Sequence, residues 1–152
     1  MRDEAKCGGR VEVRVRYAET DQMRRAHHGA YVVWCELGRT ALMRESGISY
    51  AELERRGILL PVSRLEVEYR RGAEYEELVA VETRVSAVRS RSVTFLYDVL
   101  RSSDGELLAR ASTDLVCTDV AGRPRRMPAE LRKALEELAR ADGAARPAEH
   151  AS

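Results

Sequence analysis

Residues 29–45 read Gly29-Ala-Tyr-Val-Val-Trp-Cys-Glu-Leu-Gly-Arg-Thr-Ala-Leu-Met-Arg-Glu45, and this stretch predicts the central element of the fold. One face of the predicted helix carries residues at helical spacing: Tyr31, Trp34, Cys35, Gly38 and Leu42. Further apolar side chains cover much of the remaining surface: Val32, Val33, Leu37 and Ala41. A helix that is apolar nearly all round in its first half is typically buried. We therefore expect a helix over 29–45 that other elements enclose.

Strands account for most of the remaining chain. Apolar and polar residues alternate with a period of two, as in half-buried strands, over residues 11–17, 64–70, 79–87, 93–99 and 107–118. Most of the connections between the last four are short, which favours antiparallel neighbours. A short helix is predicted after Ser49, where Glu52 completes a capping box, and Pro128 opens a last helix.

These elements must bury two apolar surfaces, one on the sheet and one on the helix. A five-stranded antiparallel sheet curled around the central helix satisfies both. This is the hot-dog arrangement of the α+β class, although the pattern alone also permits another α+β packing. We expect a single domain over residues 10–140, with a flexible N-terminus over 1–9 and a flexible tail over 141–152.

Composition excludes several classes of function. The chain has 152 residues with 26 Lys and Arg against 25 Asp and Glu, so no bulk charge favours nucleic acid or an anionic membrane. No apolar run approaches the roughly 20 residues that span a bilayer, and no apolar signal-peptide region is visible, so we expect a cytoplasmic protein. The cysteines, at 7, 35 and 117, are too scattered for a disulfide framework or a zinc site. We expect no metal and no nucleotide cofactor.

A spaced set of polar residues precedes the central helix. Asp21 follows Thr20, His28 stands seven residues later, and Tyr31 stands three residues after that histidine. This run resembles the 4-hydroxybenzoyl-CoA thioesterase family of hot-dog acyl-CoA thioesterases, over roughly residues 10 to 135. The resemblance implies thioester hydrolysis with Asp21 as base or nucleophile, catalytic roles for His28 and Tyr31, and a site at a dimer interface.

The same chemistry can be argued from the residues. Thioester hydrolysis needs a base for water, or a nucleophile, together with donors for the developing oxyanion. A helix N-terminus offers unpaired N–H groups and partial positive charge. A backbone N–H around His28 or Gly29 is placed for this task, with Asp21 on the preceding loop. Arg24 stands where the family usually has Gly, and a positive φ there would cost about 1 kcal/mol.

Other residues are weighed against structural roles. Glu36 is the alternative catalytic carboxylate, because a carboxylate on a buried helix is costly unless it is paired. An ion pair between Glu36 and Arg39 is the structural alternative. His27 is expected to be solvated or packed, and His28 could cap the helix instead of acting on substrate.

The thiol carrier is expected to be coenzyme A or a phosphopantetheine arm, present only as part of the substrate. Arg89, Arg91 and Ser92 lie at a strand turn where the family often places basic residues near the CoA phosphates. Arginine binds phosphate in a fork geometry, although ordinary solvated turn arginines would look the same in sequence.

Three functions remain open from the sequence. The first is an acyl-CoA thioesterase. The second is a thioesterase that serves a carrier protein in a biosynthetic pathway. The third is a non-catalytic acyl-CoA-binding hot-dog protein, or a dehydratase or hydratase of the same fold. Because a single curled sheet leaves exposed edges, we expect a homodimer or homotetramer.

Overall fold

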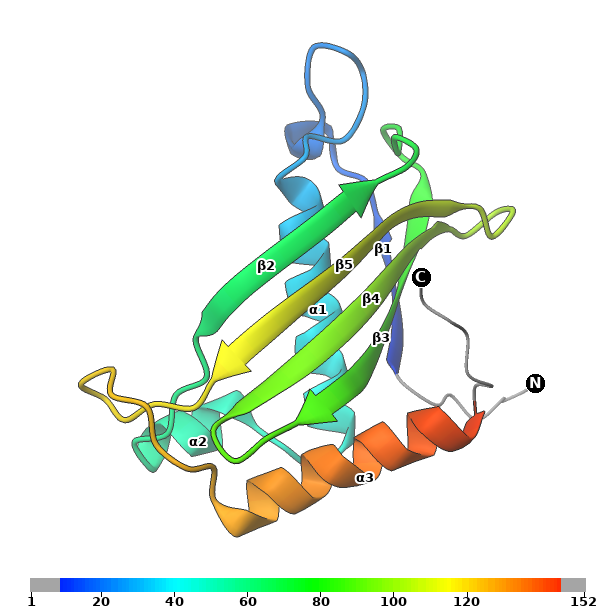
Figure 1. The fold of residues 1–152 in the computed structure, drawn as a ribbon. Coiled ribbons are helices and arrows are strands. Elements are labelled where there is room, and N and C mark those ends of the chain that lie inside the picture. The colour runs from blue at the N-terminus through cyan, green and yellow to red at the C-terminus, as the bar shows by residue number, and fades with distance from the viewer. Residues whose placement is uncertain (1–8, 146–152) are drawn as a thin grey trace.

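The computed structural model describes residues 9–145 and shows a five-stranded antiparallel sheet curled around one helix (Figure 1). The strand order is β1-β3-β4-β5-β2. The strands are β1 (Gly9–Arg14), β2 (Val62–Tyr69), β3 (Leu78–Val88), β4 (Ser92–Arg101) and β5 (Leu107–Val116). The helices are η1 (Tyr17–Glu19), α1 (Ala30–Glu45), α2 (Tyr50–Arg55) and α3 (Ala129–Ala145). The predicted hot-dog arrangement is confirmed.

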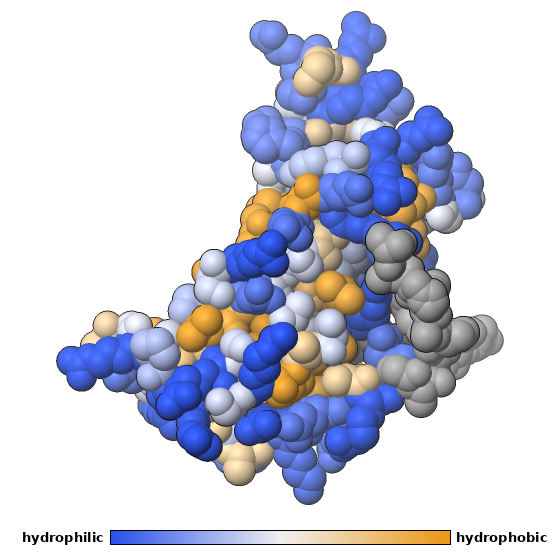
Figure 2. Space-filling view, viewed as in Figure 1, coloured by the Kyte–Doolittle hydropathy of each residue, from blue (hydrophilic) through white to orange (hydrophobic). Residues whose placement is uncertain are grey.

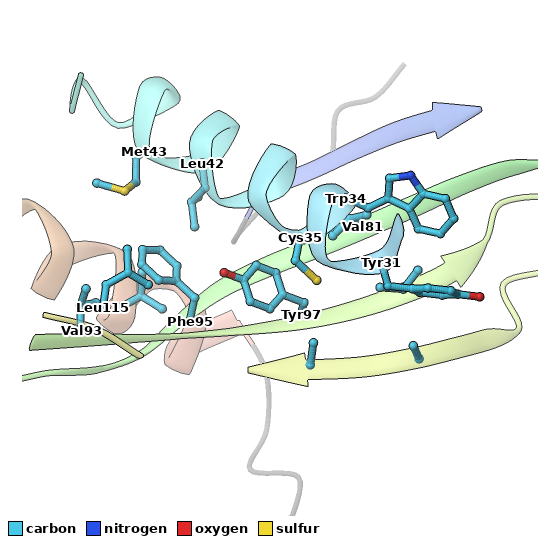
Figure 3. Packing of buried hydrophobic residues seen from close by; sticks show 14 of the residues in the cluster. Tyr31, Trp34, Cys35, Leu42, Met43, Val81, Val93, Phe95, Tyr97 and Leu115 are labelled. Atoms are coloured by element: carbon cyan, nitrogen blue, oxygen red, sulfur yellow. The ribbon is translucent and has the colours of Figure 1, made fainter. Parts of the chain in front are cut away.

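Helix α1 lies in the concave face of the sheet, and the predicted apolar face forms the core. Tyr31, Trp34 and Cys35 point toward the strands, where Tyr97 and Phe95 of β4 meet them (Figure 3). A Cβ atom at Gly38 would collide with the Thr83 hydroxyl of β3, so this position must be glycine for helix and sheet to approach so closely.

The outer face of α1 differs from the prediction. Val32, Val33 and Leu37 are 37%, 47% and 47% exposed in the single chain. Strand β2 lies at the edge of the sheet and is exposed along nearly its whole length, including Leu65 and Tyr69. The expectation that α1 is buried all round is therefore wrong for one chain. Since α1 contacts the sheet only on one side, its apolar outer face and the apolar side of β2 remain uncovered.

The first strand is shorter than the alternation suggested. It ends at Arg14, and Tyr17 begins the short helix η1 with 78% of its surface exposed. Local hydrogen bonding explains the change, because the Glu19 carboxylate accepts the backbone N–H of Arg16 at 2.9 Å and turns the chain. This turn directs the following residues away from the sheet toward the start of α1.

The predicted N-terminal tail ends one residue too late, and the predicted C-terminal tail begins too early. Gly9 is already the first residue of β1, opposite Thr83 of β3. At the other end, α3 continues through Ala145, and buried Asp142 lies 3.7 Å from the Arg84 guanidinium. An ion pair on the sheet therefore extends the folded domain past residue 140. The rest of the predicted tails, 1–8 and 146–152, lies outside the described residues.

The molecule has two functionally different ends. The loop that joins η1 to α1 projects beyond the sheet at one end, and α3 crosses the other end against β3 (Figure 1). In the space-filling view, the projecting end is mostly hydrophilic, and smaller hydrophobic areas interrupt the face of the sheet turned away from α1 (Figure 2). The predicted catalytic residues lie at the projecting end.

Candidate active site

The two carboxylate oxygens of Asp21 differ in their hydrogen bonding. Its Oδ1 accepts the backbone N–H groups of Met23 at 2.9 Å and of Arg25 at 3.2 Å. These bonds form a turn that an Asp side chain commonly stabilises. Within the described part of the chain, no hydrogen bond reaches Oδ2, and the residue is half-buried. One oxygen therefore shapes the loop while the other is available for chemistry.

Arg24 takes the backbone conformation that the missing glycine would have favoured. Its φ is +66°, in the left-handed region. The Arg24 N–H still donates to the Asp21 carbonyl at 3.0 Å, which closes the turn. The condition of that prediction, a positive φ at residue 24, is thus met, while the cost in stability stays a prediction; the loop closes its turn with arginine at this position.

The two histidines divide their roles differently from the prediction. His27, expected to be solvated or packed, accepts the N–H of Gly29, the residue directly before α1, on its Nδ1 at 3.0 Å. The rings of His27 and His28 stack with centroids 4.1 Å apart, and His28 is exposed. Among residues 9–145, no partner reaches the His28 imidazole, while its backbone carbonyl accepts the Tyr69 hydroxyl at 2.8 Å.

The bond from Gly29 to His27 changes which backbone donor is available. The Gly29 N–H, one of the two predicted oxyanion donors, is already bonded to His27. The His28 N–H makes no hydrogen bond to any described residue. Of the two donors predicted at the start of α1, the His28 N–H is therefore the one that is free to donate to a new acceptor.

Tyr31 is buried and bonded to the main chain. Its hydroxyl accepts the Ala73 N–H at 3.2 Å and lies 3.4 Å from the Arg71 carbonyl, to which it donates. Burial raises the pKa of this phenol. With 2% of its surface exposed, the side chain ties the first turn of α1 to the β2–β3 turn. The structure does not bring the predicted catalytic Tyr31 hydroxyl into contact with solvent.

Two residues that the sequence reasoning missed hold this region together. Glu19 accepts the Trp34 indole N–H on Oε2 at 3.2 Å, and its backbone carbonyl accepts the His27 N–H at 2.6 Å. The indole N–H of a buried Trp usually finds a partner. The sequence signal that could have indicated this bond was a tryptophan on the predicted core face of the helix together with an acidic residue, Glu19, directly before Thr20-Asp21.

A cavity of about 670 Å³ opens beside the loop. Its rim includes an edge-to-face pair of tyrosine rings, Tyr17 and Tyr75, with centroids 5.8 Å apart. Its lining combines the loop with the β2–β3 turn: Tyr17, Thr20, Asp21, Gln22, Arg24, Glu74 and Tyr75. Asp21 is thus the predicted catalytic carboxylate that lines a cavity large enough for a small acyl group.

Glu36 lies outside this cavity, on the exposed outer face of α1. The predicted pair with Arg39 is wrong. The buried Arg39 guanidinium instead donates to the Tyr97 hydroxyl at 3.0 Å and to the Tyr50 hydroxyl at 3.2 Å. Cys35, one turn before Arg39 on the same helix, is no alternative nucleophile, because burial raises the pKa of its thiol to about 12.

Arg89, Arg91 and Ser92 lie at the other end of the sheet. Arg89 and Arg91 belong to the β3–β4 turn and Ser92 begins β4, and the 11 residues of β3 span roughly 36 Å at about 3.3 Å per residue. Within one chain, the structure therefore does not bring these residues to Asp21. Ser92 is half-buried opposite Val116 of β5.

More arginines join this turn from the segment after β5. The Cys117 N–H donates to the Arg91 carbonyl at 2.8 Å, and the Arg125 N–H donates to the Cys117 carbonyl at 2.9 Å. We call the resulting group the basic cluster: Arg89, Arg91, Arg123, Arg125 and Arg126. None of the five forms an ion pair with a residue in 9–145, so their positive charge is available to an anion.

No three His, Cys, Asp or Glu side chains within 9–145 gather in a way that could hold a metal ion. No helix there is long and apolar enough to cross a membrane.

Comparisons with known proteins identify the family of this chain. A family model described as the thioesterase-like superfamily matches residues 15–135. YneP of Bacillus subtilis, provisionally named an acyl-CoA thioesterase, is 34% identical over 126 residues, which are 83% of this chain and 88% of that protein. The acyl-CoA thioester hydrolase YbgC of Escherichia coli O157:H7 is 28% identical over 120 residues, 78% of this chain and 89% of that protein.

A solved structure extends the likeness to three dimensions. The DHNA-CoA thioesterase from Staphylococcus aureus has a TM-score of 0.85 with 30% sequence identity, and the match covers 91% of this chain and 95% of that one. The residues matched by the family model, 15–135, include the Asp21 loop, α1 and the strands from β2 to β5. This chain belongs to the thioesterase-like superfamily.

Proposed function

We propose that this protein hydrolyses the thioester of an acyl-CoA to a free acid and CoA, with Asp21 as the catalytic carboxylate. The observation that carries the proposal is the position of Asp21, which lines the cavity between the loop before α1 and the β2–β3 turn, with Oδ2 unbonded among the described residues. The relatives that are named acyl-CoA thioesterases or thioester hydrolases support the reaction class.

The chemistry follows from two groups on the chain. Asp21 Oδ2 either takes a proton from water as that water attacks the thioester carbonyl, or attacks the carbonyl itself to form a mixed anhydride that water then opens. In both routes the C–S bond breaks, and the CoA thiolate leaves and takes up a proton. In both routes negative charge develops on the carbonyl oxygen. The His28 N–H and the positive end of the 16-residue helix α1 are the donors we assign to that charge.

The basic cluster is the candidate site for the CoA phosphates, and it widens the prediction made for Arg89 and Arg91. Five arginines without ion pairs within 9–145 suit the phosphates of the CoA nucleotide. A phosphopantetheine arm on a carrier protein has only one phosphate. The number of unpaired arginines therefore favours CoA over a carrier protein as the thiol carrier.

A second copy of the chain would bring the cluster to the catalytic loop. An edge strand that is exposed along its length can pair with the same strand of another copy. A two-fold axis at β2 reverses the partner, so the basic cluster of one chain lies at the end where the other carries Asp21. The uncovered apolar residues of α1 and β2 support such a homodimer, and pairs of dimers would form the homotetramer.

A reducing compartment suits the protein, and we propose the cytoplasm. Cys35 and Cys117 are free buried thiols, and structural disulfides are rare in the cytosol.

A thioester panel tests the proposed reaction. Straight-chain, branched and aryl CoA esters are each incubated with the protein, and released thiol is measured with a thiol-reactive dye. We expect release well above background from at least one ester. Tight binding of CoA esters without any release would instead identify a non-catalytic binding protein, and release only from acyl-carrier proteins would identify the carrier-protein thioesterase.

A further inference from the structure

The Glu19 carboxylate connects two elements of the site. Its Oε1 accepts the Arg16 backbone N–H at 2.9 Å. Its Oε2 accepts the Trp34 indole N–H at 3.2 Å and lies 3.3 Å from Nη2 of Arg16. The side chain is only 10% exposed. A carboxylate withdrawn from water is stabilised only when donors surround it, so this arrangement depends on both partners.

The backbone of Glu19 closes the loop that carries Asp21. Its carbonyl accepts the His27 N–H at 2.6 Å, and the next residue, Thr20, forms an antiparallel bridge with Ala26. Both ends of the loop therefore meet at Glu19 and Thr20. A displacement of Glu19 would move Asp21, two residues further on, together with the base of the loop.

Trp34 is the fixed partner in this contact. It lies in the second turn of α1 with 1% of its surface exposed, and its ring packs on Tyr31 with centroids 4.8 Å apart (Figure 3). A buried indole in this packing has no room to follow a moving loop. The bond from Trp34 to Glu19 thus fixes the position of the loop relative to α1, and the His28 N–H lies at the start of that helix.

We propose that Glu19 is a positioning residue, and that its bond to Trp34 sets the distance between the Asp21 carboxylate and the oxyanion donor at the start of α1. This inference rests on the proposed function. Glu19 itself does not line the cavity and touches no substrate. A shift of about 1 Å in a catalytic group can cost about 100-fold in rate, so the bond should act on turnover more than on substrate binding.

The test compares Glu19→Gln, Glu19→Ala and Trp34→Phe in the full-length protein, on the CoA ester that the wild type cleaves best. We expect Glu19→Ala to lower kcat by about 10- to 100-fold, with KM little changed. Glu19→Gln, which keeps one acceptor oxygen, should restore part of the rate. Combining Glu19→Ala with Trp34→Phe should reduce kcat no further than the worse single variant, because both changes remove the same bond.

Fluorescence supplies an independent readout, since Trp34 is the only tryptophan in the chain. Its emission should shift in the two Glu19 variants. Glu52→Gln is the matched control, because Glu52 also pairs with an arginine three residues away but lies on α2, far along the chain from the loop. This control should keep the kcat and the emission of the wild type.

The outcomes separate the inference from the proposed function. The positioning role is overturned if folded Glu19→Ala keeps the kcat of the wild type, even if its emission shifts. If the alanine variant does not fold, the same criterion applies to Glu19→Gln. Strictly multiplicative effects of Glu19→Ala and Trp34→Phe would also overturn it. A wild type that cleaves no thioester would refute the proposed function, and the inference with it.

Discussion

At the scale of single residues, the site depends on atoms within one side chain having different tasks. Asp21 uses Oδ1 to hold the loop, through the N–H groups of Met23 and Arg25, and its Oδ2 is the oxygen that we propose reacts with a water or with the thioester carbonyl. The neighbouring histidines divide the work in a similar way. His27 bonds the helix start, while His28 leaves its ring exposed.

The double role of Asp21 makes asparagine and alanine informative replacements. Asp21→Asn retains an acceptor for the loop but removes the basic oxygen, so we expect kcat to fall at least about 100-fold with the melting temperature nearly unchanged. Asp21→Ala should also lower the free energy of unfolding by about 1 kcal/mol, because the two loop N–H groups lose their acceptor. Steady-state kinetics and thermal denaturation measure the two effects.

Glu36→Gln is the control for this comparison. Glu36 is exposed on α1 and does not line the cavity, so its replacement should leave kcat close to that of the wild type. If Glu36→Gln lost activity while Asp21→Asn kept it, catalysis would have to move to the helix.

The two histidines should respond oppositely to alanine. His27→Ala removes the acceptor of the Gly29 N–H and should cost about 1 kcal/mol of stability, as the loss of one hydrogen bond does. His28→Ala removes no hydrogen bond made by the ring to a described residue, so stability should hold while kcat falls, by about 100-fold if the ring moves a proton. Equal kcat for His28→Ala and the wild type would remove His28 from the catalytic set.

At the scale of elements, the β2–β3 turn holds the loop that carries Asp21 on the start of α1. The β2–β3 turn bonds Ala26 through the Ala73 carbonyl at 2.8 Å and receives the Tyr31 hydroxyl. Its Glu74 lies 3.5 Å from the Arg25 guanidinium. Because these anchors surround the loop, the strain at Arg24 can persist without unfolding it.

The strain at Arg24 can be measured by comparing glycine with alanine. Glycine adopts a positive φ without the Cβ clash, so Arg24→Gly should be more stable than Arg24→Ala by about 1 kcal/mol. Arg44, exposed in the last turn of α1, is the matched control, and there alanine should be the more stable replacement by about 1 kcal/mol. The same order at both positions, in chemical denaturation, would show that the loop carries no backbone strain at residue 24.

At the scale of the whole molecule, the two ends of the sheet carry complementary parts of one proposed site. Asp21 lies at one end, and the basic cluster lies at the other, next to α3 (Figure 1). A chain that hydrolyses CoA esters with these parts needs a second chain running in the opposite direction. The exposed apolar face of α1 and the free edge of β2 are the surfaces that would join them.

Mixed dimers test this arrangement directly. Asp21→Asn chains and Arg89→Glu/Arg91→Glu chains are each expected to be impaired alone, the first in kcat and the second in KM for CoA esters. After unfolding and refolding together, a mixed dimer has one site with an intact Asp21 facing an intact cluster. We expect normal KM to reappear in the mixture, and its absence would place the cluster and Asp21 of one site on the same chain.

The dimer surface has its own test. Leu37→Glu places a charge on the uncovered face of α1 and should shift the protein to monomers in light scattering, with loss of turnover. Ala141→Glu, on an exposed position of α3, should leave the assembly unchanged. A wild-type protein that is monomeric at micromolar concentration would rule out the shared site.

The sequence by itself determined the elements and their faces. The periods of 3.6 and 2 are local properties, so they identified α1, the five strands and the core side of each, down to Cys35 and Cys117. The spacing of Asp21, His28 and Tyr31 predicts a site at the start of α1, and the catalytic roles of these residues stay predictions. Only the tertiary structure decided which polar atoms in that region already have hydrogen-bond partners. Contacts between elements decide four features of the site, and neither period nor spacing encodes such contacts. These features are the burial of the Tyr31 hydroxyl, the bond from Gly29 to His27, the bond from Trp34 to Glu19, and the distance of Arg89 from Asp21.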